Sequence, residues 1–231
     1  MRKQEIYDIV IRSPLLHNVE PAGCQDFIDN GRSHQVAQDS YFFHQGEPAT
    51  RLYILLSGQA RLTQVNVDGN QVILYHFSPG DGLGIIVALS NMNYPASAEA
   101  IENCQALSWD NETTQRLMLQ YPKIAFNGMK IIANRFAWLQ DRYQEMATQR
   151  VEQRIALTLL RLTRQFGKRV EEGVLIDMAL SRQDLAEMTG TNIYNVSRIL
   201  SRWDQNGLIH SQHKRITLRN SHALVLIAEG R

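Results

Sequence analysis

The spacing of apolar residues changes along the chain, and it first indicates a β-rich region. From about Arg32 to Trp109, short runs of β-forming residues are separated by turn residues at intervals of roughly 8 to 12 residues, a pattern typical of an all-β sandwich or barrel. The pair Asp68-Gly69 separates the alternating runs RLTQV and QVILY. Because Asp-Gly readily adopts the positive φ of a tight turn, we predict a β-hairpin there. Five more glycines fit the corners of a small barrel, where a Cβ is unfavourable: Gly46, Gly58, Gly80, Gly82 and Gly84.

A helical pattern follows the β-rich region. Between Glu112 and Met146 the only glycine is Gly128, and apolar residues recur at alternating intervals of three and four. We call these residues the heptad stripe: Met129, Ile132, Phe136, Leu139, Tyr143 and Met146. Pro122 is expected in the first turn of the helix, where proline is tolerated. The stripe fits either packing on the chain's own domain or a coiled coil between two copies, and its narrow width and polar surroundings favour the dimer.

The C-terminal third has the pattern of a winged helix-turn-helix. An amphipathic helix is predicted from Val151 until Gly167 ends it, and a short polar connection and strand follow. Ser181 is a good N-cap for the next helix, and Asp184 favours the same helix N-terminus. Gly190 can adopt the left-handed conformation between two helices set at a steep angle. A second helix is predicted to begin near Asn192.

The second helix has the composition of a DNA recognition helix. Its predicted buried residues are Val196, Ile199, Leu200 and Trp203, which leaves an outward face rich in polar and cationic side chains. An α-helix fits the major groove, and side chains of its N-terminal part reach base edges. Asn195 is suited to adenine, and Arg198 to guanine or a phosphate. Beyond Asn206-Gly207, a hairpin of Leu208-Ile209 with Arg215–Leu218 presents the loop 211–215 as a wing along the phosphate backbone. The candidate DNA contacts are Ser181, Arg182, Gln183, Thr191, Asn192, Ile193, Tyr194, Asn195, Ser197, Arg198, Arg202 and Lys214.

Composition and charge favour a globular protein of two domains. The chain has 231 residues, of which 44% are hydrophobic and 20% charged, and this length exceeds that of a typical single domain. The formal net charge of +1 conceals an asymmetry. Residues 148–231 hold 13 basic and 8 acidic side chains, whereas the preceding residues hold 11 and 15. A basic module joined to an acidic one is a modest electrostatic sign of nucleic-acid binding.

The sequence favours neither a membrane protein, nor a metal centre, nor an enzyme. No apolar run approaches the roughly 20 residues that span a bilayer, and the N-terminus lacks a signal-peptide pattern, so we expect a cytoplasmic protein. Cys24 and Cys104 are too few for a zinc ribbon or a four-thiolate cluster and are expected to be buried free thiols. The histidines show no HxH or HExxH spacing, and we expect no catalytic residues.

Several segments, in this order, resemble the cyclic AMP receptor protein and fumarate–nitrate reduction regulator (CRP/FNR) superfamily. They are FFHQGEPATRLYILLSGQARL, the turn PGDGLG, the long helix, and LSRQDLAEMTGTNIYNVSRILSRWDQNGLI. The resemblance covers nearly all residues after the first 15 and implies an α+β fold. Its parts would be a β-roll of the cyclic-nucleotide-binding (jelly-roll) type in residues 1–115, a dimerisation helix in 116–147, and a winged helix-turn-helix in 148–231. It also implies a homodimer that reads a palindromic operator in double-stranded DNA, with RNA polymerase as a further partner.

Departures from the family pattern bear on the effector. Cyclic-nucleotide binders carry a Glu after the glycine-containing turn and an Arg-Ser or Arg-Thr pair for the phosphate, whereas this chain has Ile85 and the segment Asn93-Tyr94-Pro95-Ala96. An anion without these partners loses charge-assisted hydrogen bonds worth about 1.5 to 3 kcal/mol each, so cyclic AMP is not the expected effector. An iron–sulfur cluster is not expected either, because the N-terminal cysteine cluster of that branch is absent. By resemblance, the effector pocket is expected around Leu83, Gly84, Ile85, Tyr94, Pro95 and Phe136.

A second departure suggests haem as a candidate cofactor. The stretch MNYPASA resembles the nitric-oxide-responsive regulators of denitrification, which are thought to sense through haem. A haem needs an axial ligand, and His17, His34, His44 and His76 are available. Of these, His17 and His76 are the first candidates, because they lie nearest to the expected pocket.

A third departure from the family pattern concerns the operator sequence. Ile193-Tyr194-Asn195-Val196 replaces a family segment whose Glu accepts a hydrogen bond from cytosine, while Ser197-Arg198 is retained. The half-site of the best-known members therefore does not transfer to this chain.

The main expectation is an allosteric regulator whose ligand biases two arrangements of the DNA-binding domains. A dimer that is active without any ligand is the rival.

Overall fold

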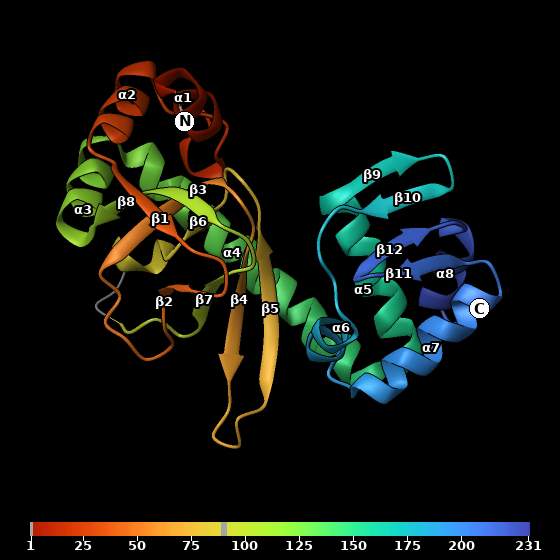
Figure 1. Ribbon diagram of the computed structural model, residues 1–231. Helices are drawn as coiled ribbons and strands as arrows, with labels where there is room; N and C mark the ends of the chain where they lie inside the picture. Colours follow the sequence, from red (N-terminus) through yellow and green to blue (C-terminus); the bar gives the residue numbers. More distant parts are fainter. Residues whose placement is uncertain (1, 89–91) are drawn as a thin grey trace. The chain divides into compact units, whose positions relative to one another are not determined.

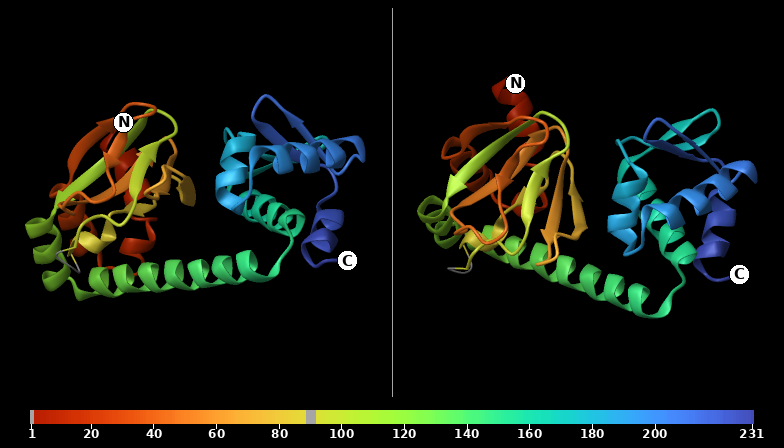
Figure 2. Two further views of the ribbon diagram at one scale, coloured as in Figure 1. Left: turned by 90° about the horizontal axis from the view of Figure 1, so that it is seen from below. Right: turned by 60° about the horizontal axis from the view of Figure 1, so that its bottom comes forward.

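The computed structural model describes residues 2–88 and 92–231 (Figure 1). The chain forms two compact units, one ending at Trp138 and the other beginning at Leu139. The division falls within helix α4 (Pro122–Thr148), which Figure 2 shows as one uninterrupted helix. The helix begins at Pro122, as predicted, because proline suits a first turn that needs no N–H donor.

The described residues of the first unit form two antiparallel four-stranded sheets, which confirms the predicted β-rich region. The strand orders are β1-β8-β3-β6 and β2-β7-β4-β5. Residues from both sheets, among them Leu55, Phe77 and Ala98, form a common core. The central residues of β3 are all buried, because this strand is covered on both faces. The strands are β1 (Arg32–Val36), β2 (Tyr41–Phe43), β3 (Arg51–Ser57), β4 (Ala60–Val65), β5 (Gln71–Phe77), β6 (Gly82–Leu83), β7 (Ser97–Ala100) and β8 (Cys104–Asp110).

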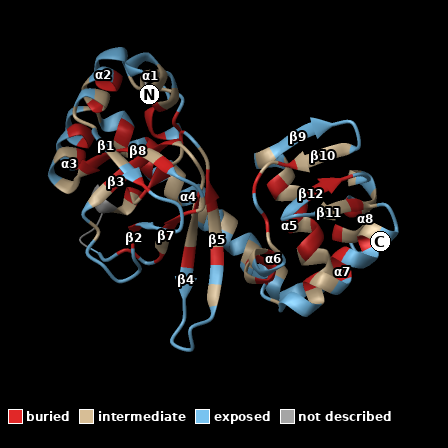
Figure 3. Cartoon of the chain, viewed as in Figure 1, coloured by how far each residue is buried: buried red, intermediate tan, exposed pale blue. Residues whose placement is uncertain are grey.

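The predicted β-hairpin joins β4 and β5, but its turn is wider than expected. Five residues, 66–70, connect the strands, and their exposure is visible in Figure 3. The Asn66 carboxamide oxygen accepts hydrogen bonds from the backbone N–H groups of Asp68 (3.0 Å) and Asn70 (2.9 Å). Gly69 has a φ of 79°, whereas Asp68 is not in the left-handed region. The side chain of Asn66 therefore organises a longer loop that the Asp-Gly pair alone does not predict.

Helices close one side of this unit and form a second core with the first sheet. Trp109 lies at its centre, with its indole N–H donating to the Phe27 carbonyl at 2.8 Å and its ring centroid 4.2 Å from that of Phe27. Helix α4 contributes Ile124, and its Asn127 amide donates to the carbonyls of Leu15 (2.9 Å) and His17 (2.8 Å). One face of α4 therefore packs on its own unit. The other helices are α1 (Lys3–Val10), η1 (Pro14–Leu16), α2 (Pro21–Asp29), η2 (Ile85–Ala88) and α3 (Asn111–Gln120).

The heptad stripe lies largely on a different face of α4. Ile132 packs partly against the core of the first unit. The other five stripe residues are 43 to 78% exposed. Packing within the chain thus involves Ile132 in the first unit and part of Met146, whose methyl group lies beside Gly190 in the second unit, and dimerisation through the five exposed residues stays a prediction.

The second unit combines helices with the antiparallel sheet β11-β12-β10-β9. Helix α5 ends at Gly167, as predicted, and a Cβ at this position would lie 2.2 Å from the Thr163 carbonyl oxygen, so only glycine fits. No described helix of either unit is long and apolar enough to cross a membrane. The elements are α5 (Val151–Phe166), β9 (Gly167–Val170), β10 (Gly173–Ile176), α6 (Arg182–Thr189), α7 (Ile193–Gln205), β11 (Ile209–Gln212), β12 (Arg215–Leu218) and α8 (Ser221–Ala228).

Candidate nucleic-acid interface

Helices α6 and α7 begin and end where the sequence predicts. The Ser181 hydroxyl accepts a hydrogen bond from the Asp184 N–H (3.0 Å), and the Asp184 carboxylate accepts one from the Ser181 N–H (2.7 Å). This reciprocal pair is a capping box. Gly190 ends α6 with a φ of 59°, and the Asn192 side chain caps α7 by accepting from the Asn195 N–H at 2.9 Å. Local capping therefore fixes the helix-turn-helix geometry.

Helix α7 has one buried and one outward face. The four residues predicted to be buried, Val196, Ile199, Leu200 and Trp203, are each at most 6% exposed. On the outward face, Asn195 is held by its neighbours. Its amide nitrogen donates to the Thr191 hydroxyl (3.1 Å), and its carboxamide oxygen accepts from the Arg198 guanidinium (3.3 Å). Asn195 therefore orients Arg198 along the helix surface and must exchange these bonds before it can pair with a base.

The predicted wing is a tight hairpin between β11 and β12. Its two connecting residues, His213 and Lys214, have φ values of 49° and 61°, as a type I′ turn requires. The Lys214 carbonyl accepts a hydrogen bond from the Leu180 N–H at 2.7 Å, which ties the wing to the start of α6. The loop is thus shorter than the predicted stretch 211–215, because Ser211, Gln212 and Arg215 belong to the strands.

A groove lies between α6, α7 and the wing. Its cavity volume is about 280 Å³, and its lining includes four candidate DNA contacts, Ser181, Arg182, Ile193 and Lys214. Arg182 and Lys214 have no carboxylate partner among the residues that the structure describes. The groove therefore places two available cations beside the N-terminus of the recognition helix, which suits a polyanion.

Other candidate contacts have partners on the surface of the same chain. The Arg202 guanidinium pairs with the Glu152 carboxylate at the start of α5, and the same oxygen accepts from the Trp203 indole N–H at 3.0 Å. The Gln183 amide donates to Glu187 at 2.9 Å. The side chains of Asn192, Tyr194, Ser197 and Arg198 all reach the surface. Arg202 would therefore have to leave or share Glu152 before its guanidinium could contact DNA.

Two arginines that the sequence analysis did not single out hold the helix-turn-helix. Arg142, in the last part of α4, donates to the Met188 carbonyl and, at 3.1 Å, to the Thr158 hydroxyl. Its side chain is 12% exposed, and burial lowers its pKa to about 10. Arg154 donates to the carbonyls of Thr189 (2.9 Å) and Gly190 (3.4 Å). These guanidinium groups satisfy the free carbonyls at the C-terminus of α6, a role that the spacing along the chain does not reveal.

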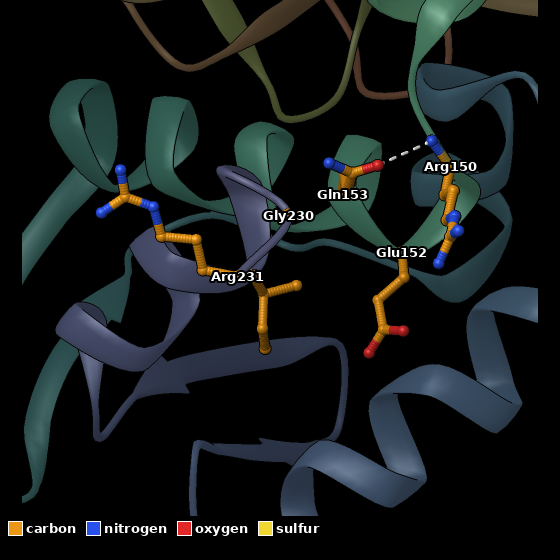
Figure 4. A pocket seen from close by; sticks show the side chains of 6 residues that line it. Arg150, Glu152, Gln153, Gly230 and Arg231 are labelled. Carbon is orange, nitrogen blue, oxygen red and sulfur yellow. Dashed lines mark hydrogen bonds between the residues drawn. The ribbon is translucent and has the colours of Figure 1, made fainter.

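A second groove in this unit lies where α5 begins and α8 ends (Figure 4). Its cavity volume is about 440 Å³. The Gln153 side chain accepts from the Arg150 N–H at 3.0 Å, and Glu152 lines the same groove. Glu152 also pairs with Arg202 of α7. The groove therefore shares one lining residue with the contacts that position α7.

In the first unit, most residues expected around the effector pocket pack in the core. Leu83, Ile85 and Tyr94 are buried. The Tyr94 ring stacks on Phe43 with centroids 3.8 Å apart, and its hydroxyl donates to the Arg51 carbonyl at 2.7 Å. A Cβ at Gly84, whose φ is 70°, would lie 2.6 Å from that carbonyl. Pro95 and Phe136 are exposed. Side chains of the protein therefore fill the space around Tyr94.

A cavity of about 290 Å³ lies instead between α4 and the ends of β5 and β6. Its lining residues are Pro14, Tyr75, Asp81, Gly82, Ile131, Asn134, Arg135 and Trp138. The Arg135 guanidinium donates to the Gly82 carbonyl at 2.7 Å and lies 5.3 Å from the ring centroids of both Tyr75 and Phe77. Burial lowers the pKa of Arg135 and raises that of Asp81. The cavity thus combines aromatic walls with one positive and one negative group.

The histidines and cysteines do not form a cofactor site among the described residues. His17 and His44 are exposed, His34 packs beside Phe42 and Tyr53, and His76 is buried in β5. None of them lines the α4 cavity, and no described cluster of three His, Cys, Asp or Glu side chains could hold a metal ion. No described histidine therefore faces the α4 cavity, and haem as a cofactor stays a prediction. Cys24 and Cys104 are buried free thiols, as predicted.

Comparisons with known proteins identify both units. The cyclic nucleotide-binding domain model matches residues 33–121, and the Crp-like helix-turn-helix domain model matches residues 153–227. A CRP-like cAMP-activated global transcriptional regulator of Mycobacterium tuberculosis is 24% identical over 94% of this chain and 97% of its own length. The transcriptional activator protein anr of Pseudomonas aeruginosa is 26% identical over 94% of this chain and 88% of its own length.

Solved structures of regulators have the same fold. FixK2 from Bradyrhizobium japonicum matches with a TM-score of 0.75 and 22% identity, covering 84% of this chain and 96% of that one. A CRP-family transcriptional regulator from Thermus thermophilus matches with a TM-score of 0.71 and 26% identity, covering 85% and 96%. The relatives are regulators and not enzymes, and the β-roll, long helix and C-terminal helix-turn-helix agree with the α+β fold that the sequence resemblance implies. The chain belongs to the CRP/FNR superfamily of DNA-binding transcription regulators.

Proposed function

We propose that the protein is a homodimeric regulator that binds a palindromic operator and responds to an effector other than cyclic AMP. The observation that carries this proposal is the outward face of α7, which lies beside a wing and a groove with available cations. Each copy would place α7 in the major groove of one half-site. RNA polymerase is the expected further partner at the promoter, and the cytoplasm, where the operator DNA lies, is the expected location.

Sequence-specific binding is tested by selecting duplexes from a random pool with the full-length protein and measuring affinity by fluorescence anisotropy. Arg198→Ala is expected to weaken binding to the selected site about 5- to 150-fold, the effect of losing one bidentate base contact. Arg219→Ala is the matched control, because Arg219 pairs with Glu172 at 2.6 Å. No enriched sequence, or equal affinity of wild type and Arg198→Ala, would contradict the proposal.

The heptad stripe supports the homodimer part of the proposal. Five of its residues leave large apolar surfaces exposed on a single chain, and a partner helix with the same spacing would bury them. Leu139→Glu is expected to convert a dimer to a monomer in light scattering, since it places a charge in the interface. Leu119→Glu is the control, because Leu119 is 82% exposed but lies on α3, outside the stripe. A monomeric wild type, or a dimer that tolerates Leu139→Glu, would exclude this interface.

Contacts within the second unit give a route from the stripe to the DNA-binding face. The Met146 methyl carbon lies 2.5 Å from the place of a Cβ on Gly190, so this stripe residue packs directly on the turn between α6 and α7. Arg142 joins the same stretch of α4 to the end of α6. A shift of the stripe between two dimer arrangements would therefore reach the recognition helix through rigid contacts.

The effector part of the proposal rests on the first unit. The segment expected to clamp a cyclic phosphate contributes no cation, and its Tyr94 fills the space beside Phe43. The α4 cavity is a better candidate site, because Arg135 can donate to a ligand acceptor and Tyr75 and Trp138 offer apolar walls. A ligand there would contact α4 directly and so bias the dimer helix.

Effector binding is tested by calorimetry and by absorption spectroscopy. Cyclic AMP is expected to give no binding heat at about 1 mM, roughly the weakest affinity that such a titration detects. Haem mixed with the protein is expected to keep the broad Soret band of free haem, without a shift or sharpening, because no described histidine lines the cavity. Saturable binding of either would contradict this part of the proposal. Operator binding that no small molecule changes would favour the rival, a dimer active without ligand.

A further inference from the structure

The recognition helix begins with two exposed apolar side chains. Ile193 is 39% exposed and Tyr194 is 82% exposed. From α5 to the C-terminus, the other large apolar residues exposed to a comparable degree are Val170 and Val225, at 42% and 38%. Tyr194 is thus the most exposed large apolar residue of this part of the chain, and it lies in the first turn of α7. Most of the Tyr194 side chain therefore has no neighbour within its own unit to cover it.

The surroundings of the pair favour DNA as the partner that covers it. Ile193 shares its groove with Arg182 and Lys214, and Arg198 lies one helical turn beyond Tyr194. An apolar protein surface docked here would have to desolvate these cations, whereas a duplex neutralises them with phosphates. The major-groove edges of the base pairs carry one methyl group, the C5-methyl of thymine, and aliphatic and aromatic side chains recognise it by contact.

We propose that Ile193 and Tyr194 read thymine methyl groups in each half-site, an inference that rests on the proposed docking of α7 in the major groove. Residues 194 and 198 are separated by about 6 Å along the helix axis. With about 3.4 Å between base pairs, a guanine read by Arg198 lies about two base pairs from the thymine read by Tyr194. In relatives with a Glu at this part of the helix, that Glu accepts a hydrogen bond from a cytosine. The half-site of this protein therefore has a thymine in place of that cytosine.

The test replaces thymine by uracil, one position at a time, in the site selected by the full-length protein. Uracil keeps the base pair and removes only the methyl group. At the positions that Ile193 and Tyr194 contact, we expect a roughly fourfold loss of affinity for each methyl removed, the effect of one buried methyl group. Ile193→Ser should bind equally well with thymine or uracil at the base that Ile193 contacts. Tyr194→Ala should do so at the base that Tyr194 contacts. Tyr194→Phe should keep the preference, because the ring remains. Val170→Ser is the matched control, an exposed apolar residue of the same unit on β9.

The outcomes separate this inference from the function on which it rests. Thymine-to-uracil replacement without effect on the wild type, or an unchanged thymine preference in both Ile193→Ser and Tyr194→Ala, would overturn the methyl readout while specific DNA binding stands. A pool that yields no enriched sequence would overturn the proposed function as well. If Tyr194→Ala instead abolished binding to a copurifying protein and left the thymine preference intact, the apolar pair would belong to a protein interface and the inference would be wrong.

Discussion

The salt dependence of operator binding tests whether the wing meets the phosphate backbone. Lys214 lies at the tip of the β11–β12 hairpin with a φ of 61°, and it has no carboxylate partner among the described side chains. Asparagine tolerates this left-handed conformation and is common in type I′ turns, so Lys214→Asn removes the charge with little backbone strain. The substitution is expected to weaken binding to all sequences about equally, because phosphates carry no sequence information.

The magnitude follows from the number of phosphates neutralised. Arg182 and Lys214 give two available cations per copy, and therefore four in a dimer. Each phosphate contact contributes about 0.9 to the slope of log affinity against log salt, so these four contribute about 3.6. Between about 50 and 200 mM salt this corresponds to about a 150-fold loss of affinity, and removal of two contacts reduces it to about 12-fold.

The assay is fluorescence anisotropy on the selected operator over this range of KCl concentration. Lys214→Asn is expected to lower the slope by about 1.8 relative to wild type. Arg219→Ala, whose charge is already paired with Glu172, should leave the slope unchanged. Equal slopes for wild type and Lys214→Asn would refute the placement of the wing on the backbone, even if the affinity itself fell.

Three further predictions concern stability and reactivity. Gly190→Ala should destabilise the second unit more than Gly207→Ala does in thermal unfolding. Both substitutions place alanine at a positive φ, at a cost of about 1 to 2 kcal/mol, but only the alanine at position 190 collides with Met146. Combining each substitution with Met146→Ala should remove the difference. Arg142→Met should lower the free energy of unfolding, measured in urea, by about 2 to 3 kcal/mol, because it leaves the Met188 carbonyl without this donor and removes a charged hydrogen bond. A smaller loss than that caused by Arg116→Met, at an exposed arginine, would argue against a stabilising role of Arg142. Burial raises the pKa of Cys104 to about 11, so its alkylation at pH 8 should be about 100-fold slower in the folded protein than in urea, and equal rates would show that the thiol is accessible.

The candidate site was predictable where short-range contacts determine it. Ser181, Gly190 and Asn192 end or begin helices through bonds to residues at most four positions away, so their types and spacing suffice. The stripe was harder, because a helix has more than one apolar face. Ile132 packs on the core of its own unit, and Phe126, outside the predicted stripe, is 57% exposed. Periodicity gives the angle between residues and does not say which neighbour covers each face.

The sequence by itself determined the order of the elements, the caps of the helix-turn-helix and the resemblance to the CRP/FNR superfamily, because these depend on residue types at fixed local spacings. Only the tertiary structure decided which side chains are available. Arg202 is held by Glu152, 50 residues away, and Tyr94 is held by Arg51 at a separation of 43. Arg135 faces a cavity because β5 and β6 fold against α4. Charge pairing and filling of space depend on groups that the fold brings together from distant positions, and no local pattern specifies them.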